Sequence, residues 1–344
     1  MASRTDVPAA STGPGRRTIL RGLAAAGTLC GLAAPHLARG VGTRSLKLGY
    51  VGPSDSQFGV GATEFARRIE IATGGAYRIE PYPNGVLGGE AEMLNGMRKG
   101  ELDLGIISAV VFASVVPDFG VFDLPFLFRD AAHARAVLDG PIGQDFLDKF
   151  RARELMPLAW GENGVRHITN SRRPVRAPAD LRGLKLRVPQ SDVMLRCFRQ
   201  LGVDAAPLAF PGVYGALESG RFDGQENPIS VIRSTHLDRV QHHLTLSGHI
   251  YSSAIIFMSN DSWDDLSPAQ CAAFTDVARA SGLATREAAG QAERDGIEAL
   301  QAAGMEIVPS VDRNAFLAAL EPTWSELARQ FGEDRIARIR AIAA

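Results

Sequence analysis

The residue best suited to chemistry in this chain is an arginine in an otherwise apolar segment. Arg187 lies within residues 184–188, where alternation places Leu184, Leu186 and Val188 on one face of a strand and Lys185 and Arg187 on the other. A guanidinium group is planar and permanently charged, so it can hold a carboxylate through two parallel hydrogen bonds. Pro189 ends the strand and leaves Arg187 at its carboxyl end, the edge where α/β sheets bind ligands. Spacing alone leaves open that Arg187 is a surface residue or the partner of a structural acid.

Two further polar segments interrupt apolar stretches. Residues 161–167, Gly-Glu-Asn-Gly-Val-Arg-His, are predicted to connect two lobes. Arg166 in this segment either faces a cleft or is solvated. Residues 223–228, Asp-Gly-Gln-Glu-Asn-Pro, follow a short apolar stretch, and their composition predicts a turn.

Catalytic patterns are missing from the sequence. It has no nucleophile elbow, phosphate loop, dinucleotide-type glycine cluster or zinc pattern. His242 and His243 have no further ligand at metal-binding spacing, and Asp264-Asp265, just before Ser267, are typical of a helix lead-in. We therefore expect no enzyme activity, no cofactor and no metal.

Length and charge narrow the class of protein. The chain has 344 residues, enough for two lobes of ordinary size, and 45% of them are hydrophobic. The 37 basic and 38 acidic residues give a net charge of -1, so no nucleic-acid partner is indicated. Cys197 and Cys271 are not closely spaced and are expected to be buried thiols, while Cys30 lies in the leader.

The first forty residues have the pattern of an export signal. Arg16-Arg17 precede Ile19 and Leu20, a short Ala/Gly/Leu stretch follows, and small residues surround positions 38–42, where cleavage is expected. The arginine pair favours a twin-arginine signal, and a plain secretory signal is the alternative. The mature protein is predicted to lie in the periplasm.

Strands and helices alternate after the leader. Residues 46–51 are predicted as a strand, 58–69 as a helix, 77–82 as a strand, 93–97 as a short helix and 102–107 as a buried strand. This order is typical of an α/β fold, with helices on the faces of a sheet.

A second set of elements repeats this plan. Residues 184–188 form a strand, a helix capped by Ser191 follows, and residues 211–219 form another helix. Ser267 and Pro268 begin a predicted helix of about 35 residues and about 50 Å, long enough to cross both lobes. One last helix is expected over residues 313–343.

Several of these segments resemble the DctP-like solute-binding subunits of tripartite ATP-independent periplasmic (TRAP) transporters. The resemblance covers nearly all of the mature chain. The segments that carry it are Tyr82-Pro83-Asn84-Gly85, Leu87-Gly88-Gly89-Glu90, Leu124-Pro125-Phe126, Gly164-Val165-Arg166, residues 183–189, and residues 207–228. The blocks at 183–189 and 207–228 are the most specific.

The resemblance implies a two-lobed periplasmic-binding-protein-like α/β fold, with a hinge, a ligand cleft between the lobes and a long helix spanning both. Lobe I is expected to comprise residues 44–165 plus 253–292. Lobe II is expected to comprise residues 166–252 plus 293–344, and residues 1–40 form the signal peptide. Hinge closure around the ligand is a known motion of periplasmic binding proteins.

The resemblance also assigns the ligand-binding residues. Arg187 matches the arginine that holds the ligand carboxylate, and Arg166 matches a second, supporting arginine. The remaining matched cleft positions are Gln190, Phe210, Asn227, Glu90 and His249. Ser108 stands where sialic-acid binders carry a glutamate, which makes sialic acid a poor candidate ligand.

The sequence therefore predicts a solute-binding protein for a small organic acid. Its expected partners are the small and large membrane subunits of a TRAP transporter, and the protein itself is expected to be monomeric. A binding protein that serves a sensor kinase and a periplasmic enzyme on the same scaffold remain alternatives. An ABC-type binding protein is disfavoured by the block at 183–189 and by residues 223–228.

Overall fold

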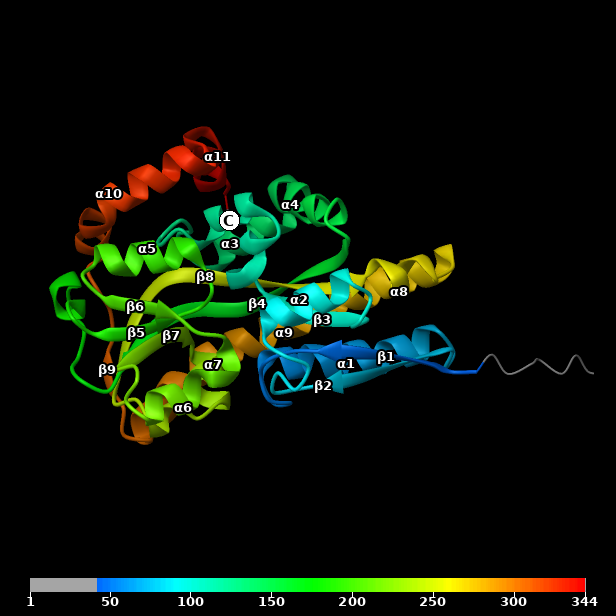
Figure 1. The fold of residues 1–344 in the computed structure, drawn as a ribbon, viewed down its shortest axis with the longest axis horizontal. Coiled ribbons are helices and arrows are strands. Elements are labelled where there is room, and N and C mark those ends of the chain that lie inside the picture. The colour runs from blue at the N-terminus through cyan, green and yellow to red at the C-terminus, as the bar shows by residue number, and fades with distance from the viewer. Residues whose placement is uncertain (1–41, 344) are drawn as a thin grey trace, which may run out of the picture. The chain divides into compact units, whose positions relative to one another are not determined.

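A computed structural model describes residues 42–343, in which strands and helices alternate (Figure 1). The strands are β1 (Arg44–Gly49), β2 (Tyr77–Tyr82), β3 (Leu104–Ser108), β4 (Leu155–Asn170), β5 (Lys185–Val188), β6 (Asp204–Pro207), β7 (Gly224–Pro228), β8 (His243–Ser259) and β9 (Glu306–Val308). The α-helices are α1 (Gln57–Ala72), α2 (Glu90–Arg98), α3 (Ala131–Asp139), α4 (Pro141–Arg151), α5 (Asp192–Gln200), α6 (Val213–Glu218), α7 (Ile229–Ser234), α8 (Asn260–Asp264), α9 (Pro268–Ala302), α10 (Arg313–Phe331) and α11 (Glu333–Ala341). Five short 3₁₀ helices are η1 (Ala109–Ser114), η2 (Pro117–Asp123), η3 (Pro178–Leu181), η4 (Phe210–Gly212) and η5 (Leu237–Arg239).

One sheet runs through residues 42–343, in the order β2-β1-β3-β8-β4-β7-β5-β6, with β9 paired to β8. We call β1, β2 and β3 the first half and β5, β6 and β7 the second half, because the strands within each half are parallel. The long strands β4 and β8 lie between the halves and pair with each other antiparallel. Since β3 pairs antiparallel with β8 and β7 antiparallel with β4, the two halves run in opposite directions.

Both faces of the first half are covered by helices. On β3, Leu104 and Ile106 pack in a cluster with α1 and the start of α9, whereas Ile107 packs with α2 and the aromatic residues of η1 and η2. The same alternation continues on β8, where Ile256 and Phe257 belong to opposite clusters. Burial on both faces explains why β3 has no polar side chain before Ser108.

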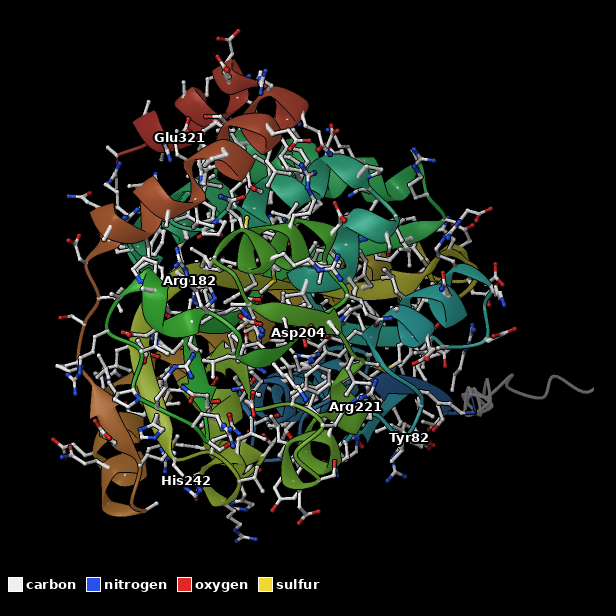
Figure 2. All side chains as sticks on the ribbon, turned by 60° about the vertical axis from the view of Figure 1, so that its left-hand side comes forward. Tyr82, Arg182, Asp204, Arg221, His242 and Glu321 are labelled. Atoms are coloured by element: carbon white, nitrogen blue, oxygen red, sulfur yellow. The ribbon has the colours of Figure 1, made fainter. Side chains whose placement is uncertain are left out.

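The second half is covered in the same way. Helices α5 and α10 pack on one face, and α6, α7 and the end of α9 pack on the other. Figure 1 shows the last two helices, α10 and α11, in red beyond α5. In Figure 2, labels identify Asp204 at the start of β6 and Glu321 on α10, and Tyr82 at the end of β2 in the first half.

Helix α9 joins the two halves of the fold. It packs against α1, then along β4, and finally against α7 (Figure 1). Ser281 Oγ donates to the backbone oxygen of Gly61 at 2.8 Å, and Glu162 N donates to Thr285 Oγ1 at 2.9 Å. Glu293 near its end pairs with His167 at 2.8 Å. The capping box of Ser267 and Gln270 begins this 35-residue helix, as the sequence predicted.

Two of the predicted elements differ from the structure. Residues 223–228 are not a turn, because β7 occupies Gly224–Pro228 and is buried throughout. Residues 161–167, predicted to connect two lobes, are part of the continuous strand β4. The C-terminal stretch forms two helices, since Gly332 adopts a φ of 93° and ends α10.

The close approach of α9 to β4 predicts the effect of two glycine substitutions. A Cβ on Gly282 would lie 2.0 Å from the carbonyl oxygen of Trp160, so Gly282→Ala should lower the free energy of unfolding by about 1–3 kcal/mol. Gly290 lies on the same helix, and the nearest atom to its Cβ would be 3.5 Å away. Gly290→Ala should therefore raise that free energy by about 0.5–1 kcal/mol. Urea unfolding measures both, and equal effects would contradict the close approach.

Candidate ligand-binding site

A cavity lies where the carboxyl ends of the two halves face each other. Ser108 at the end of β3 is level with Gly161 of β4, because both pair with Ala254 of β8. Pro228 at the end of β7 pairs with Arg166 of β4. The two sets of strand ends are thus separated only by residues 162–165 of β4. Carboxyl ends of parallel strands are the usual place for ligands in α/β sheets.

The cavity lining comes from both halves and from the strand between them. The first half contributes Val51, Gly52, Ser56, Gln57, Phe58, Glu90, Ser108 and Val110. The crossing strand β4 contributes Asn163 and Arg166. The second half contributes Arg187, Pro189, Phe210, Asn227, Val231, Ser234 and Thr235.

One wall of the cavity contains Arg166, which belongs to a buried ion pair. Arg166, which is 1% exposed, donates from Nε to Glu226 Oε2 at 2.5 Å and from Nη2 to Glu226 Oε1 at 2.7 Å. Its Nη2 also donates to Asn227 Oδ1 at 3.2 Å. Burial opposes the ionisation of Glu226, but Arg166 and a hydrogen bond with His249 outweigh it and lower the pKa of that carboxyl. The charge of Arg166 is therefore neutralised within the protein.

The guanidinium group of Arg187 has no such counterion. It is 3% exposed, and its Nε donates to the backbone oxygen of Leu208 at 2.8 Å. Among residues 42–343, neither terminal nitrogen has a hydrogen-bond partner, and no acidic side chain lies within 4.0 Å of the group. Burial lowers the pKa of Arg187 to about 10, with Glu226 and Glu90 raising it and Arg166 lowering it. Arg187 is thus a cation at neutral pH whose two terminal nitrogens are available to an anion.

The facing wall is formed by polar side chains of the first half. Glu90 is the first residue of α2, and its Oε1 accepts a hydrogen bond from Ser108 N at 2.7 Å. Burial raises the pKa of Glu90, although the Ser108 hydrogen bonds and the two arginine charges act in the opposite direction. Gln57 Nε2 donates to Asn163 Oδ1 at 2.7 Å, and Gln57 Oε1 is buried without a partner in the described chain.

Small residues allow the two walls to meet at the rim. A Cβ on Gly85 would lie 3.0 Å from Cγ of Pro211, and one on Gly89 would lie 3.5 Å from Cβ of Ala209. Asn84 and Gly85 both have positive φ, 60° and 64°, so this turn favours glycine for backbone reasons as well. The halves are therefore in contact above the cavity.

A buried carboxyl group supports the helix behind Arg187. Ser191 caps α5 by accepting a hydrogen bond from Met194 N, and its hydroxyl donates to Asp123 Oδ2 at 2.6 Å. Asp123 is 3% exposed, and burial raises its pKa to about 7, despite the hydrogen bond from Ser191. The cap of α5 is thus linked to a carboxyl group that titrates near neutral pH.

Six of the eight predicted site residues line the cavity. These are Arg187, Arg166, Glu90, Ser108, Phe210 and Asn227. Gln190 is exposed and is not in the lining, although the preceding residue, Pro189, is. His249 lies behind the lining, where it bonds Glu226 Oε2 at 3.2 Å and Ser247 Oγ at 2.8 Å. The roles of all eight residues remain predictions.

Sequence reasoning missed three polar groups of this site. Glu226 and Asn163 stood in segments identified by composition as a turn and a connection, and Gln57, just before the predicted helix at 58–69, was given no role. Glu226 pairs with Arg166, 60 residues away in sequence, and Gln57 pairs with Asn163, 106 residues away. A local sequence pattern cannot reveal such partners. The only available signal was the density of amides and acids in residues 161–167 and 223–228.

Some features are absent from the described part of the chain. Within residues 42–343, no group of three or more His, Cys, Asp or Glu side chains is arranged to hold a metal. No helix in this range combines the length and the apolar character needed to cross a bilayer. Cys197 is buried and Cys271 half-buried, and the two do not form a disulfide. The predicted leader, with Cys30, lies outside the described residues.

Residues 48–330 match the DctP family, described as bacterial extracellular solute-binding protein, family 7. The chain belongs to this family. It is 41% identical over 287 residues to a solute-binding protein of Verminephrobacter eiseniae, covering 83% of this chain and 86% of the relative. The predicted resemblance to DctP-like TRAP proteins is confirmed.

Solved structures of TRAP periplasmic solute-binding proteins have the same fold. One from Polaromonas sp. JS666, bound to D-erythronate, superposes with a TM-score of 0.86 at 42% identity, covering 88% of this chain and 99% of that protein. One from Bordetella, with density interpreted as pantoate, superposes with a TM-score of 0.85 at 44% identity, covering 88% of this chain and all of that protein. The two-lobed α/β fold predicted from the sequence is confirmed.

The ion pair of Arg166 and Glu226 predicts a large loss of stability when one partner is removed. Glu226→Gln leaves a buried guanidinium without its counterion, which should lower the free energy of unfolding by about 3–5 kcal/mol. Glu293→Gln removes the acid of a pair in which Glu293 is 36% exposed, and should cost less than about 1 kcal/mol. Urea unfolding at pH 7 measures the free energy of unfolding of both variants. Equal losses would mean that burial of the Arg166–Glu226 pair does not make its disruption more costly than that of an exposed pair.

Asp123 predicts a pH dependence of stability. Its pKa is about 7 in the fold and near 3.8 in an unfolded chain, so between these values the native state binds the proton and the unfolded state does not. The contribution of Asp123 to the free energy of unfolding is therefore greatest below about pH 4 and decreases as the pH rises toward 7. Asp123→Asn can still accept the Ser191 hydrogen bond. Urea unfolding should show this variant similar to wild type at pH 4 and more stable by about 2–4 kcal/mol at pH 8. A difference that is independent of pH would contradict the assignment.

Proposed function

We propose that this protein is the extracytoplasmic solute-binding subunit of a TRAP transporter. In this proposal it captures a small organic acid through a salt bridge with Arg187 and delivers it to the membrane permease. The observation that carries the proposal is the buried guanidinium of Arg187, which faces the cavity and has no counterion within 4.0 Å in residues 42–343.

The cost of burying Arg187 supports this role. A buried cation is destabilising unless an anion pairs with it, and most of the penalty is recovered when the pair is bidentate. Glu226 does not supply the pairing, because Arg166 occupies both of its carboxylate oxygens. A ligand carboxylate would complete the site, and the acids bound to the two similar structures are consistent with that chemistry.

The lobe boundaries predicted from the sequence are part of the proposal. The boundary at 165/166 falls on β4 between the ends of β3 and β7, and the boundary at 252/253 falls on β8, its pairing partner. β-Bulges interrupt the β4–β8 pairing between Glu162 and Gly164 and between Arg166 and Ile168. We propose that the hinge lies here, because bulges weaken the ladder locally and bend the strand.

Export and partners extend the proposal beyond the cavity. The twin-arginine leader with cleavage near residues 38–42, the periplasmic location, the monomeric state and the small and large TRAP membrane subunits remain predictions from the sequence. Members of this family are extracellular solute-binding proteins, which agrees with export.

Substitution of Arg187 tests the proposal. Arg187→Met should weaken binding of the ligand at least about 100-fold, because a desolvated charged hydrogen-bonded pair is lost. It should leave the ligand-free protein as stable as wild type or more stable, since an uncompensated buried cation is removed. Arg187→Lys should be intermediate, because it keeps the charge and loses the planar fork. Thermal shift with a carboxylate library that includes D-erythronate and pantoate, followed by calorimetry, measures both effects.

Lys185 provides the matched control. It lies on the same strand and the same face but is exposed, so Lys185→Met should leave ligand affinity unchanged. If no acid raises the melting temperature of the wild type, the proposed function is wrong. If an acid binds Arg187→Met as tightly as the wild type, Arg187 is not the anchor.

A further inference from the structure

Three charged side chains line the cavity, Arg166, Arg187 and Glu90, and only Arg166 has a counterion, Glu226, which is not part of the lining. Arg166 and Glu226 neutralise each other through two hydrogen bonds between their side chains. Arg187 and Glu90 remain, and they are on opposite walls, since Arg187 is on β5 and Glu90 begins α2. No ion pair within 4.0 Å joins them in residues 42–343. The cavity therefore has one available cation, Arg187, on the wall from the second half, and one available carboxyl group, Glu90, on the wall from the first half.

Glu90 is held in place but not fully bonded. Its Oε1 accepts from Ser108 N at 2.7 Å, which fixes the carboxyl group against the end of β3. Among residues 42–343 its only hydrogen-bond partner is Ser108, and a carboxylate has enough lone pairs to accept a further hydrogen bond. With 9% of its surface exposed, Glu90 has little water with which to complete its bonding. A group that donates a hydrogen bond to this carboxylate would satisfy it.

Gln57 has a buried polar atom without a partner. One end of its amide bonds Asn163 at 2.7 Å, and the other end, Oε1, is buried without a partner in the described chain. Leaving a buried polar atom unpaired costs about 1–3 kcal/mol. Gln57 and Glu90 both line the cavity from the first half, opposite Arg187. A hydroxyl group both donates and accepts, so it can bond either end of the amide as well as the carboxyl of Glu90.

Resting on the proposed function, we infer that the cavity selects a hydroxylated monocarboxylate and excludes dicarboxylates. The ligand carboxylate binds Arg187, and its hydroxyl groups donate to the carboxylate of Glu90 and bond the unpaired end of Gln57. Glu90 and Gln57 are thus specificity-determining residues, and the chemical class of the ligand is a short polyhydroxy acid of the sugar-acid type.

Charge and hydrogen bonding disfavour dicarboxylates and unsubstituted fatty acids as ligands. A second carboxylate accepts hydrogen bonds and cannot donate them, so it cannot bond Gln57 Oε1 or the ionised carboxylate of Glu90 in a site with little water. The single free cation, Arg187, is already used by the first carboxylate. An unsubstituted fatty acid avoids the repulsion but leaves both polar groups unpaired, and sites that hydrogen-bond a hydroxyl strongly reject analogues that lack it.

Three acids with four carbon atoms separate these effects. D-Erythronate has one carboxylate and three hydroxyls, butyrate has one carboxylate and no hydroxyl, and succinate has two carboxylates. Isothermal titration calorimetry of the wild-type protein should give an affinity for D-erythronate at least about 100-fold higher than for either of the other two.

Two variants locate the selectivity. Glu90→Gln keeps an oxygen for Ser108 N and removes the negative charge, so the preference for D-erythronate over succinate should fall at least about tenfold. Gln57→Met keeps the length of the side chain and removes the amide, so the preference for D-erythronate over butyrate should fall about tenfold. Glu101→Gln is the matched control, because Glu101 is exposed, does not line the cavity and changes the net charge equally. It should leave all three affinities unchanged.

The outcomes distinguish this inference from the proposed function. If succinate or butyrate binds the wild type as tightly as D-erythronate, and Arg187→Met abolishes that binding, the function stands and the selectivity is wrong. If Glu90→Gln and Gln57→Met leave both preferences unchanged while remaining folded by circular dichroism, these residues do not determine specificity. If no acid binds at all, the proposed function itself fails.

Discussion

The pairing of β4 with β8 is the constraint on which the rest of the structure depends. These strands of 16 and 17 residues are long enough to serve both halves of the sheet, and each half pairs with a different one of them. Because β3 adds to β8 and β7 adds to β4, the halves must run in opposite directions, and their carboxyl ends must face each other. The cavity is therefore a consequence of strand pairing. The glycine at 282 of α9 lets this helix lie against the same strand and fixes both halves to it.

The crossing strand also determines which charge is available in the cavity. Arg166 lies where β4 meets the end of β7, and this register places it beside Glu226 and Asn227. The pairing of β4 with β7 brings Arg166 and Glu226 together, so the charge of Arg166 is already neutralised in the folded protein. Arg187 is on the next strand but one, where its neighbours offer only the carbonyl oxygen of Leu208. Two arginines that look equivalent in the sequence are thus separated into a structural cation and an available one.

The sequence predicted elements whose pattern is local and failed for those whose burial is decided by distant partners. The alternation around Arg187, the Ser191 cap and the Ser267–Gln270 capping box are local, and the corresponding elements are present. Strand β7 was wrongly predicted as a turn because Gln225, Glu226 and Asn227 are polar. They are buried because β4 supplies Thr169 and Arg166 as partners. Six of the eight residues that family resemblance assigned to the site line the cavity. Of the other two, Gln190 follows the lining residue Pro189 in sequence, and His249 is hydrogen-bonded to Glu226.

The unpaired groups of the cavity explain why a ligand would favour the closed arrangement. With the walls in contact at Gly85 and Pro211, the buried side chains of Arg187, Glu90 and Gln57 still have hydrogen-bonding capacity that the described chain does not use. In the proposed hinge motion, separation of the halves would hydrate these groups, which favours the open arrangement when no ligand is bound. A hydroxy acid supplies an anion for Arg187 and donors for Glu90 and Gln57, and it can do so only when both walls are present. Its differential contacts with the closed state therefore shift the population toward closure, and an acid that leaves Glu90 or Gln57 unpaired shifts it less. Specificity and closure then have the same physical origin, because each hydrogen bond that distinguishes one acid from another also holds the two walls together.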